Sequence, residues 1–393
     1  MTSEWKTYKI KDVLSYVVDN RGKTPPVQDE GFELLEVNAI SATEKFPQYQ
    51  VVRKHVSEHV YNTWFRSGHP QIGDILVPTV GTLGAVSYMN KDNCCIAQNL
   101  IALRANKDIC DCDYLYYILR NPNTRKRLLN LNIGGVQPSI KVPHLMELEI
   151  SLPDIGTQKK ISSILKTIDD KISTNQKIND NLQWQAFALF DKLLSGEHLE
   201  VCSLSEIAEL NPKRSLTKNE MARCIDMAQL STSGSFPNGW EIKPYNGGMR
   251  FANGDTLLAR ITPCLENGKT AYIDFLDADE IAFGSTEYVV MCSQGQYPSE
   301  FFYCLARYPS FVDYAVKNMN GSSGRQRVSA ETIGKYILPR LTDDELAEFR
   351  DVVPALFSAM RLNSLENINL SELRDALLQK LMSGEIDVSD IQL

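Results

Sequence analysis

Apolar residues recur at alternating steps of four and three along one stretch of the chain. The stretch runs from Ile161 to Leu193 and contains ten positions at this spacing, of which eight are apolar. This heptad pattern predicts a long amphipathic helix over residues 158–194, roughly 55 Å long at about 1.5 Å per residue. Two of the ten positions are Asn175 and Asn179. A polar residue on a helix seam costs stability and fixes the register of the pair.

The same pattern returns 188 residues further along the chain. The register runs without a gap over 161–197, so that Asn175 and Asn179 fall on Asn363 and Asn367. The repetition predicts that the two helices pair with each other through these four asparagines. The alternative is that each helix packs only on its own domain. A matched pair would align the asparagines in either direction, so the pattern leaves parallel and antiparallel arrangements open.

The second helix differs from the first by a proline. Pro354 stands where the first helix has Lys166. Because proline removes a backbone donor, we expect it to kink the second helix or to mark a new start. Each helix is predicted to end at a Ser-Gly step, with Gly196 or Gly384 as the residue that follows the helix.

The segments outside the helices also repeat, with small insertions. Gly73-Asp74-Ile75-Leu76 resembles Gly254-Asp255-Thr256-Leu257. Short apolar runs at 74–78 and 97–103 predict strands, and 112–131 is predicted to be helical, which indicates an α+β fold with mixed strands. We therefore predict two pseudo-symmetric globular domains and two spacer helices, with the boundaries 1–154, 155–198, 199–340 and 341–393.

Composition restricts the class of protein. The chain has 393 residues, a net charge of -8 and nine cysteines. It has no apolar run of membrane-spanning length and no predicted secretion signal, so we expect reduced thiols and a cytoplasmic location with no membrane partner. The acidity argues at first against nucleic acid. However, residues 1–150 carry net +1, whereas residues 340–393 carry net -6. The average charge therefore does not exclude DNA.

Basic side chains gather around two Gly-rich loops. Residues 114–146 contain five basic side chains and no acidic one, and the matching stretch 303–330 contains four basic and one acidic. Glycine allows close backbone approach to a phosphate, while Arg, Lys and Gln can contact phosphates or base edges. The alternative is a solvated helix face followed by a turn. The candidate DNA contacts, including two further basic loops, are Arg21, Lys23, Arg125, Lys126, Arg127, Gln137, Lys141, Lys213, Arg214, Arg325, Gln326 and Arg327.

Motifs for catalysis are scarce. His55-Val56-Ser57-Glu58-His59 matches a short zinc-peptidase pattern, but the second copy has no counterpart. Gly268-Lys269-Thr270 resembles the end of a P-loop, but Pro263 stands where the first glycine belongs. The cysteine spacings suit no tetrahedral zinc site. We therefore predict no catalytic residue and no metal site on this chain.

Taken in order, these motifs resemble the specificity subunit of Type I restriction-modification systems. The resemblance covers nearly the whole chain. The duplicated order of the motifs is more specific to this family than any single motif. It rests on Gly73–Leu76, the Gly-rich loop with Gln137 and Ile140, Leu152-Pro153, Gln158–Ile161, Asp169–Ile172 and Leu193–Glu197.

The resemblance implies a function for each part. Each globular domain would be a target recognition domain that reads one half of a split double-stranded DNA sequence. The helices would pack antiparallel, set the spacing and dock two methyltransferase subunits in a bacterial or archaeal cytoplasm. S-adenosylmethionine would bind to those subunits, and ATP and Mg²⁺ to restriction subunits, so this chain would hold no cofactor. A pseudo-symmetric protein-docking scaffold that does not bind DNA is the alternative.

Overall fold

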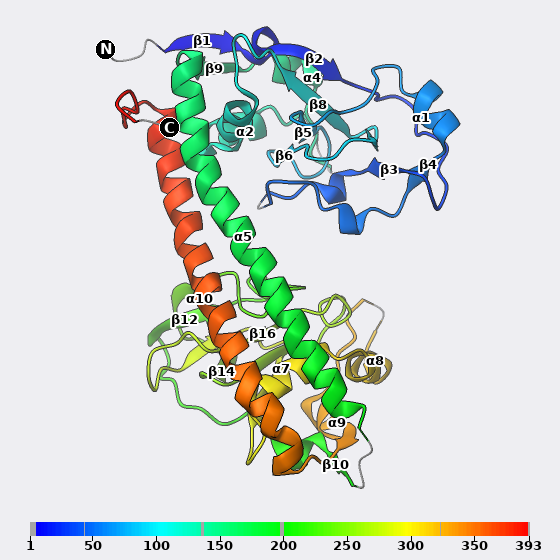
Figure 1. The fold of residues 1–393 in the computed structure, drawn as a ribbon, viewed down its shortest axis with the longest axis vertical. Helices are drawn as coiled ribbons and strands as arrows, with labels where there is room; N and C mark the ends of the chain where they lie inside the picture. The colour runs from blue at the N-terminus through cyan, green and yellow to red at the C-terminus, as the bar shows by residue number, and fades with distance from the viewer. Residues whose placement is uncertain (1–4, 43, 135–136, 197–199, 323, 392–393) are drawn as a thin grey trace. The chain divides into compact units, whose positions relative to one another are not determined.

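A computed structural model describes residues 5–42, 44–134, 137–196, 200–322 and 324–391. The chain divides into two compact units. Unit 1 comprises Met1–Asp170 with Ser371–Leu393, and unit 2 comprises Lys171–Leu370. Each unit is an α+β body that includes part of both long helices (Figure 1). The predicted α+β class is confirmed.

The described residues of unit 1 form three small sheets. Their strand orders are β1-β9, β2-β8-β5-β6 and β4-β3-β7, and only β3 and β7 pair in parallel. The elements are β1 (Lys6–Lys9), η1 (Ile10–Val13), β2 (Leu14–Val18), β3 (Phe32–Leu35), η2 (Val37–Ala39), η3 (Tyr49–Val51), β4 (His55–Val56), α1 (Glu58–Trp64), β5 (Ile75–Pro78), β6 (Ser87–Tyr88), β7 (Cys94–Ile96), β8 (Leu100–Ala105), α2 (Cys112–Arg120), α3 (Pro122–Asn130), α4 (Val142–Met146) and β9 (Glu149–Leu152).

Unit 2 repeats this arrangement. Its sheets have the orders β10-β19, β11-β18-β15-β16 and β13-β12-β17-β14, and β12 and β17 are the parallel pair. The elements are β10 (Val201–Ser203), α6 (Leu204–Ile207), β11 (Ala208–Leu210), β12 (Met221–Ile225), β13 (Glu241–Pro244), β14 (Met249–Phe251), β15 (Thr256–Ala259), β16 (Thr270–Tyr272), β17 (Ala282–Gly284), β18 (Tyr288–Ser293), α7 (Ser299–Arg307), α8 (Pro309–Lys317), α9 (Ala330–Gly334) and β19 (Ile337–Pro339).

The two long helices are α5 (Ile155–Leu194) and α10 (Asp343–Met382), each of 40 residues. Within unit 2 they run antiparallel, because Lys192 pairs with Glu348 while Lys171 pairs with Glu366. The heptad pattern alone had not determined whether the two helices are parallel or antiparallel. Pro354 lies inside α10 without ending it. Its neighbour Val353 is fully buried in the core, and we infer that packing offsets the backbone bond that proline removes.

Two sequence predictions of unit 1 need correction. The helix expected over 112–131 is two helices, because Asn121 leaves the helical conformation and its side chain caps α3, whose first residue is Pro122. The strand expected over 97–103 begins only at Leu100. The Leu100 amide instead closes a turn by donating to the Ala97 carbonyl oxygen.

Each unit has its own hydrophobic core. In unit 1, Ile161 and Leu165 of α5 join Leu381 of α10 and the helices of the body. In unit 2, Phe190 of α5 packs against Phe301, with ring centroids 5.0 Å apart. None of the helices in the described part of the chain is both long and apolar enough to cross a membrane.

Candidate nucleic-acid interface

The Gly-rich loop of unit 1 is anchored to the chain that leaves β5. The Gly81 amide donates to the Pro138 carbonyl oxygen at 2.9 Å, and the Ile140 amide donates to Thr79 at 2.8 Å. Glycine is required where the loop turns, because a Cβ on Gly134 would lie 2.0 Å from the carbonyl oxygen of Gln137. Backbone bonds therefore hold the loop and leave the Gln137 side chain exposed.

Unit 2 builds the same anchor from different residues. The Thr262 amide donates to the Gln326 carbonyl oxygen, and the Val328 amide donates to Arg260, both at 3.0 Å. The bridge between Ile261 and Arg327 corresponds to a bridge between Val80 and Ser139 in unit 1. The loop therefore occupies the same place in both units, as the repeated sequence suggests. Three positions of these loops, Gly135, Val136 and Ser323, lie outside the described residues.

Helix α3 carries three consecutive basic side chains beside the loop of unit 1. Thr124 and Leu128 are buried and fix the helix on the body, whereas Arg125, Lys126 and Arg127 are exposed. The stem of Arg125 covers Gly84, where a Cβ would lie 2.9 Å from its Cγ.

Most of the predicted basic contacts are exposed and unpaired. Among the described residues, seven of the ten predicted cations form no side-chain hydrogen bond and no ion pair, and an unpaired surface cation is available to a phosphate. The seven are Lys23, Arg125, Lys126, Arg127, Lys141, Lys213 and Arg325. Gln137 and Gln326 also form no side-chain hydrogen bond there, although Gln326 is only half-exposed.

The other three predicted cations are paired with carboxylates. Arg21 donates to both oxygens of Asp19, each at 2.7 Å. Arg327 donates to both oxygens of Glu287. These two side chains remain partly exposed, and their contact with DNA stays a prediction.

Arg214 has a different environment from the other predicted cations. Its side chain is 19% exposed and lies 2.6 Å from Asp255, which is fully buried. Burial raises the pKa of Asp255, so its ionised form depends on this partner. The placement favours a structural role for Arg214 over the phosphate contact that the sequence suggested.

Unit 1 neutralises the equivalent aspartate with an arginine from another strand. Asp74 is buried at the start of β5, and Arg104 of β8 donates to both of its oxygens, at 2.9 and 2.8 Å. The pairing of β8 with β5 corresponds to that of β18 with β15, which places Cys292 where unit 1 has Arg104. The repeated Gly-Asp motif indicated both aspartates, but nothing in the sequence indicated which arginine each would use.

The four seam asparagines meet in pairs in unit 2. Asn175 donates to Asn367 at 2.9 Å, and Asn363 donates to Asn179 at 2.9 Å. Asn175 also donates to Glu366 at 2.7 Å, so the polar layer extends to a carboxylate. This crossed pattern fits an antiparallel register only, because the residue numbers rise on α5 as they fall on α10.

Comparisons with known proteins agree with this arrangement. The family model for the Type I restriction modification DNA specificity domain matches residues 2–183. The chain is 23% identical to the Type I restriction enzyme HindI specificity subunit of Haemophilus influenzae, over 75% of this chain and 82% of that protein. It is 24% identical to the MjaIX specificity subunit of Methanocaldococcus jannaschii, over 72% and 71%.

This chain resembles the Type I restriction-modification specificity subunits over most of its length, and the family model covers 182 of its 393 residues. Its fold is also that of the S subunit from M. genitalium, with a TM-score of 0.59 at 16% identity, over 97% of this chain and 96% of that one. A specificity subunit is the DNA-recognition component of its system and is non-catalytic, as the motifs predicted.

Among the described residues, the zinc-peptidase pattern does not form a metal-binding cluster. His55 lies on β4 and His59 on α1, and Ser57 between them caps the helix. Among the described residues, no group of three or more His, Cys, Asp and Glu side chains could hold a metal ion. The cysteines are free thiols, and burial raises the pKa of Cys95 to about 12, so it is no ready nucleophile.

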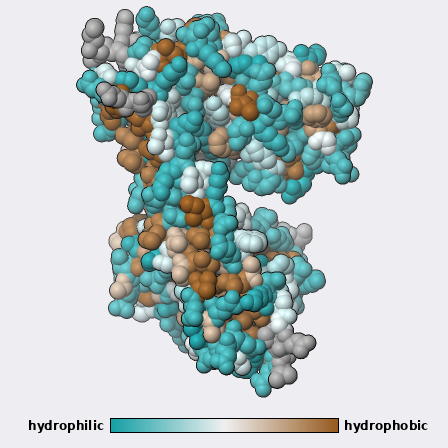
Figure 2. All heavy atoms as spheres, viewed as in Figure 1, coloured by the Kyte–Doolittle hydropathy of each residue, from teal (hydrophilic) through white to brown (hydrophobic). Residues whose placement is uncertain are grey.

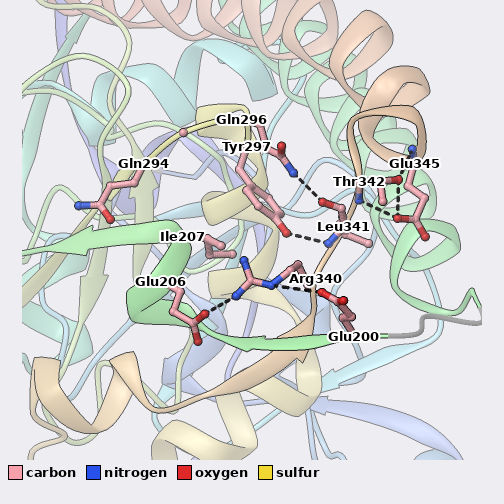
Figure 3. Close-up of a pocket in the computed structure, with 11 residues that line it drawn as sticks. Glu200, Glu206, Ile207, Gln294, Gln296, Tyr297, Arg340, Leu341, Thr342 and Glu345 are labelled. Carbon is pink, nitrogen blue, oxygen red and sulfur yellow. Dashed lines mark hydrogen bonds and ion pairs between the residues drawn. The ribbon is translucent and has the colours of Figure 1, made fainter.

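A surface groove of about 700 Å³ lies in unit 2, where α10 begins (Figure 3). Its polar groups bond to one another. Arg340 pairs with Glu206, and the Tyr297 hydroxyl accepts the Leu341 amide at 2.9 Å. The groove therefore presents few free polar groups to a ligand.

Proposed function

We propose that this specificity subunit reads a split DNA sequence, with each unit recognising one half. The observation that carries the proposal is the duplicated interface. In both units a Gly-rich loop is anchored by backbone bonds to the strand end beside it, and unpaired cations lie next to that loop. Cations that contact phosphates position a protein on DNA, and side chains on an ordered loop can then contact base edges.

The two long helices would set the number of base pairs between the half-sites. Forty residues of α-helix extend about 60 Å, and one turn of DNA is about 34–36 Å. Helices of this length suit half-sites about one turn apart. The asparagine layer supports a fixed register, since a slip would leave polar groups unpaired.

Two methyltransferase subunits would dock on the helices and the surfaces beside them. In unit 2 the helices expose large apolar side chains, with Trp184 68% and Leu362 60% exposed, and Figure 2 shows apolar surface over this pair. Apolar surface of this kind suits a protein partner. The net charge of -6 over residues 340–393 suits such a partner better than a phosphate backbone.

The chemistry would belong to the partner subunits. The methyltransferases would bind S-adenosylmethionine and flip the target adenine, because its amino group is inaccessible inside the stack. Restriction subunits would bind ATP and Mg²⁺ and supply translocation and cleavage. This chain would then contribute recognition and spacing alone.

Reconstitution with the methyltransferase subunit tests the proposal. Methylation mapped across a genome should give a bipartite target with a fixed gap. A continuous target, or no methylation, would contradict it. DNA binding by the complex that does not depend on salt would instead favour a docking scaffold, because phosphate contacts give a steep salt dependence.

A further inference from the structure

We propose that Arg327, held in place by Glu287, reads a guanine in the half-site bound by unit 2. This inference rests on the proposed function and assigns one base contact within it. Arg327 is the only one of the three carboxylate-paired candidate cations that lies on a Gly-rich loop.

Glu287 fixes the guanidinium of Arg327 along one edge. Nε lies 3.0 and 2.9 Å from the two carboxylate oxygens, and Nη2 lies 2.7 Å from Oε1. Nη1 donates to the Arg325 carbonyl oxygen at 3.1 Å. An arginine has five N–H groups, so these bonds leave one on each terminal nitrogen. Guanine presents two acceptors, O6 and N7, in the major groove, and two such donors would contact them.

The backbone under Arg327 is also fixed. Its amide and carbonyl groups exchange two hydrogen bonds with Asn320, each at 2.9 Å, and it forms a bridge with Ile261. The side chain is nevertheless 40% exposed. A partly exposed side chain that is already held in one position loses little freedom on binding, which favours specific readout.

The neighbouring carboxylate favours a base contact over a phosphate contact. Arg327 holds the pKa of Glu287 below its usual value, so the carboxylate is ionised at neutral pH. Its bonds occupy the Nε edge of the guanidinium, which a phosphate would otherwise use, and leave one donor on each terminal nitrogen of Arg327. Arg260 lies 3.4 Å from the same carboxylate and offsets its charge. Arg325 is exposed and unpaired two residues away, and it is better suited to a phosphate.

The corresponding loop of unit 1 has no arginine at the position of Arg327. Ser139 occupies the bridge position of Arg327, and a neutral Thr79 stands beside the loop in place of Arg260. The hydroxyl of Thr79 donates to the Asn99 carbonyl oxygen at 3.1 Å. A guanine contact of this kind is therefore expected in one half-site only.

Atom-specific DNA analogues test the inference on the complete complex with its methyltransferase subunits. Each guanine of the mapped target is replaced in turn by 7-deazaguanine, which lacks the N7 acceptor, and affinity is measured by competition. For the natural chain, one guanine should show a loss of about fivefold or more. In Arg327→Met, which removes the donors but keeps much of the side-chain length, the same replacement should cause no further loss.

Two more variants separate readout from folding. Glu287→Gln keeps the shape of the anchor and should reduce the 7-deazaguanine penalty without abolishing binding. Arg325→Gln is the matched control: it should weaken binding to every duplex and leave the penalty unchanged. An unchanged penalty in Arg327→Met, in a complex with a bipartite target, would overturn this inference alone. Absence of a bipartite target would overturn the proposed function, and this inference with it.

Discussion

Arg374 of α10 donates a hydrogen bond to Asp169 of α5 across 3.0 Å inside unit 1. The side chains are 12% and 7% exposed, and the Tyr117 hydroxyl donates to the other oxygen of Asp169 at 2.7 Å. The 188-residue register places Phe357 and Ala186 at the equivalent positions of unit 2, and both are fully buried. One repeat thus joins its helices by a buried ion pair, and the other joins them by apolar packing.

This difference predicts that replacing both residues of the ion pair in unit 1 is tolerated, whereas removing one of them is strongly destabilising. Arg374→Met should lower the free energy of unfolding by about 3–5 kcal/mol, because it leaves Asp169 buried without a counter-charge. The double variant Asp169→Phe with Arg374→Ala, which copies unit 2, should recover much of that loss. Denaturant unfolding measures both. A double variant less stable than Arg374→Met would contradict the interpretation.

Because both Gly-Asp motifs place a buried aspartate beside an arginine, we predict that the arginine of unit 2 can be moved to the position that it has in unit 1. Arg214→Ser should be strongly destabilising, by about 3–5 kcal/mol, since Asp255 would lose its partner. Adding Cys292→Arg, which reproduces the position of Arg104, should restore stability. Thermal unfolding checks both variants. Because protonation removes the buried charge, the penalty of Arg214→Ser should be smaller in acid. A penalty independent of pH would contradict this explanation.

The basic face of α3 predicts a change in salt dependence. Replacing Arg125, Lys126 and Arg127 by Gln should reduce the slope of log affinity against log salt by up to about 3, at about 0.9 for each phosphate contact. The target sequence should not change, because phosphate contacts carry little sequence information. DNA titration of the complex at several salt concentrations measures the slope. Lys54→Gln is the control, because Lys54 already pairs with Glu36.

The hydrogen bonds of Asp154 predict that the stability of the first turn of α5 depends on pH. Its carboxylate accepts the Thr157 hydroxyl at 2.7 Å and the amides of Gly156 and Thr157, and these bonds lower its pKa. Asp154→Ala should cost about 1 kcal/mol at neutral pH, and Asp154→Asn much less. The stabilisation is present above the usual carboxyl pKa and is lost as pH falls through the lowered value. The difference between the natural chain and Asp154→Ala should therefore disappear only in strong acid, as unfolding at several pH values would show.

The paired asparagines predict how the spacer must be altered. Four residues inserted between Asn175 and Asn179, together with four between Asn363 and Asn367, should lengthen the DNA gap by about two base pairs, since four residues add about 6 Å of helix. Both half-sites should stay unchanged in a methylation map. Insertion in α5 alone should destabilise the pair, because it separates the asparagine layers. A changed half-site in the double insertion would refute the spacer role.

The sequence by itself determined the repeated features of this protein. The shift of 188 residues identified α5 and α10, their polar layer and the two copies of an α+β body, because helical periodicity and duplicated motifs are local properties of the chain. The Gly-rich loops were also recognisable, since glycine was needed at Gly134 for the backbone to approach Gln137 closely.

Only the tertiary structure decided the direction of the helices and the partner of each charge. The heptad pattern is the same for parallel and antiparallel helices. The hydrogen bonds from Asn175 to Asn367 and from Asn363 to Asn179 fit only the antiparallel direction. Arg214 and Arg327 belong to similar basic loops in the sequence, but one is buried on Asp255 and the other is held by Glu287 at the surface. Such pairings join residues about 40 positions apart, so they depend on how the strands meet, which local patterns do not encode.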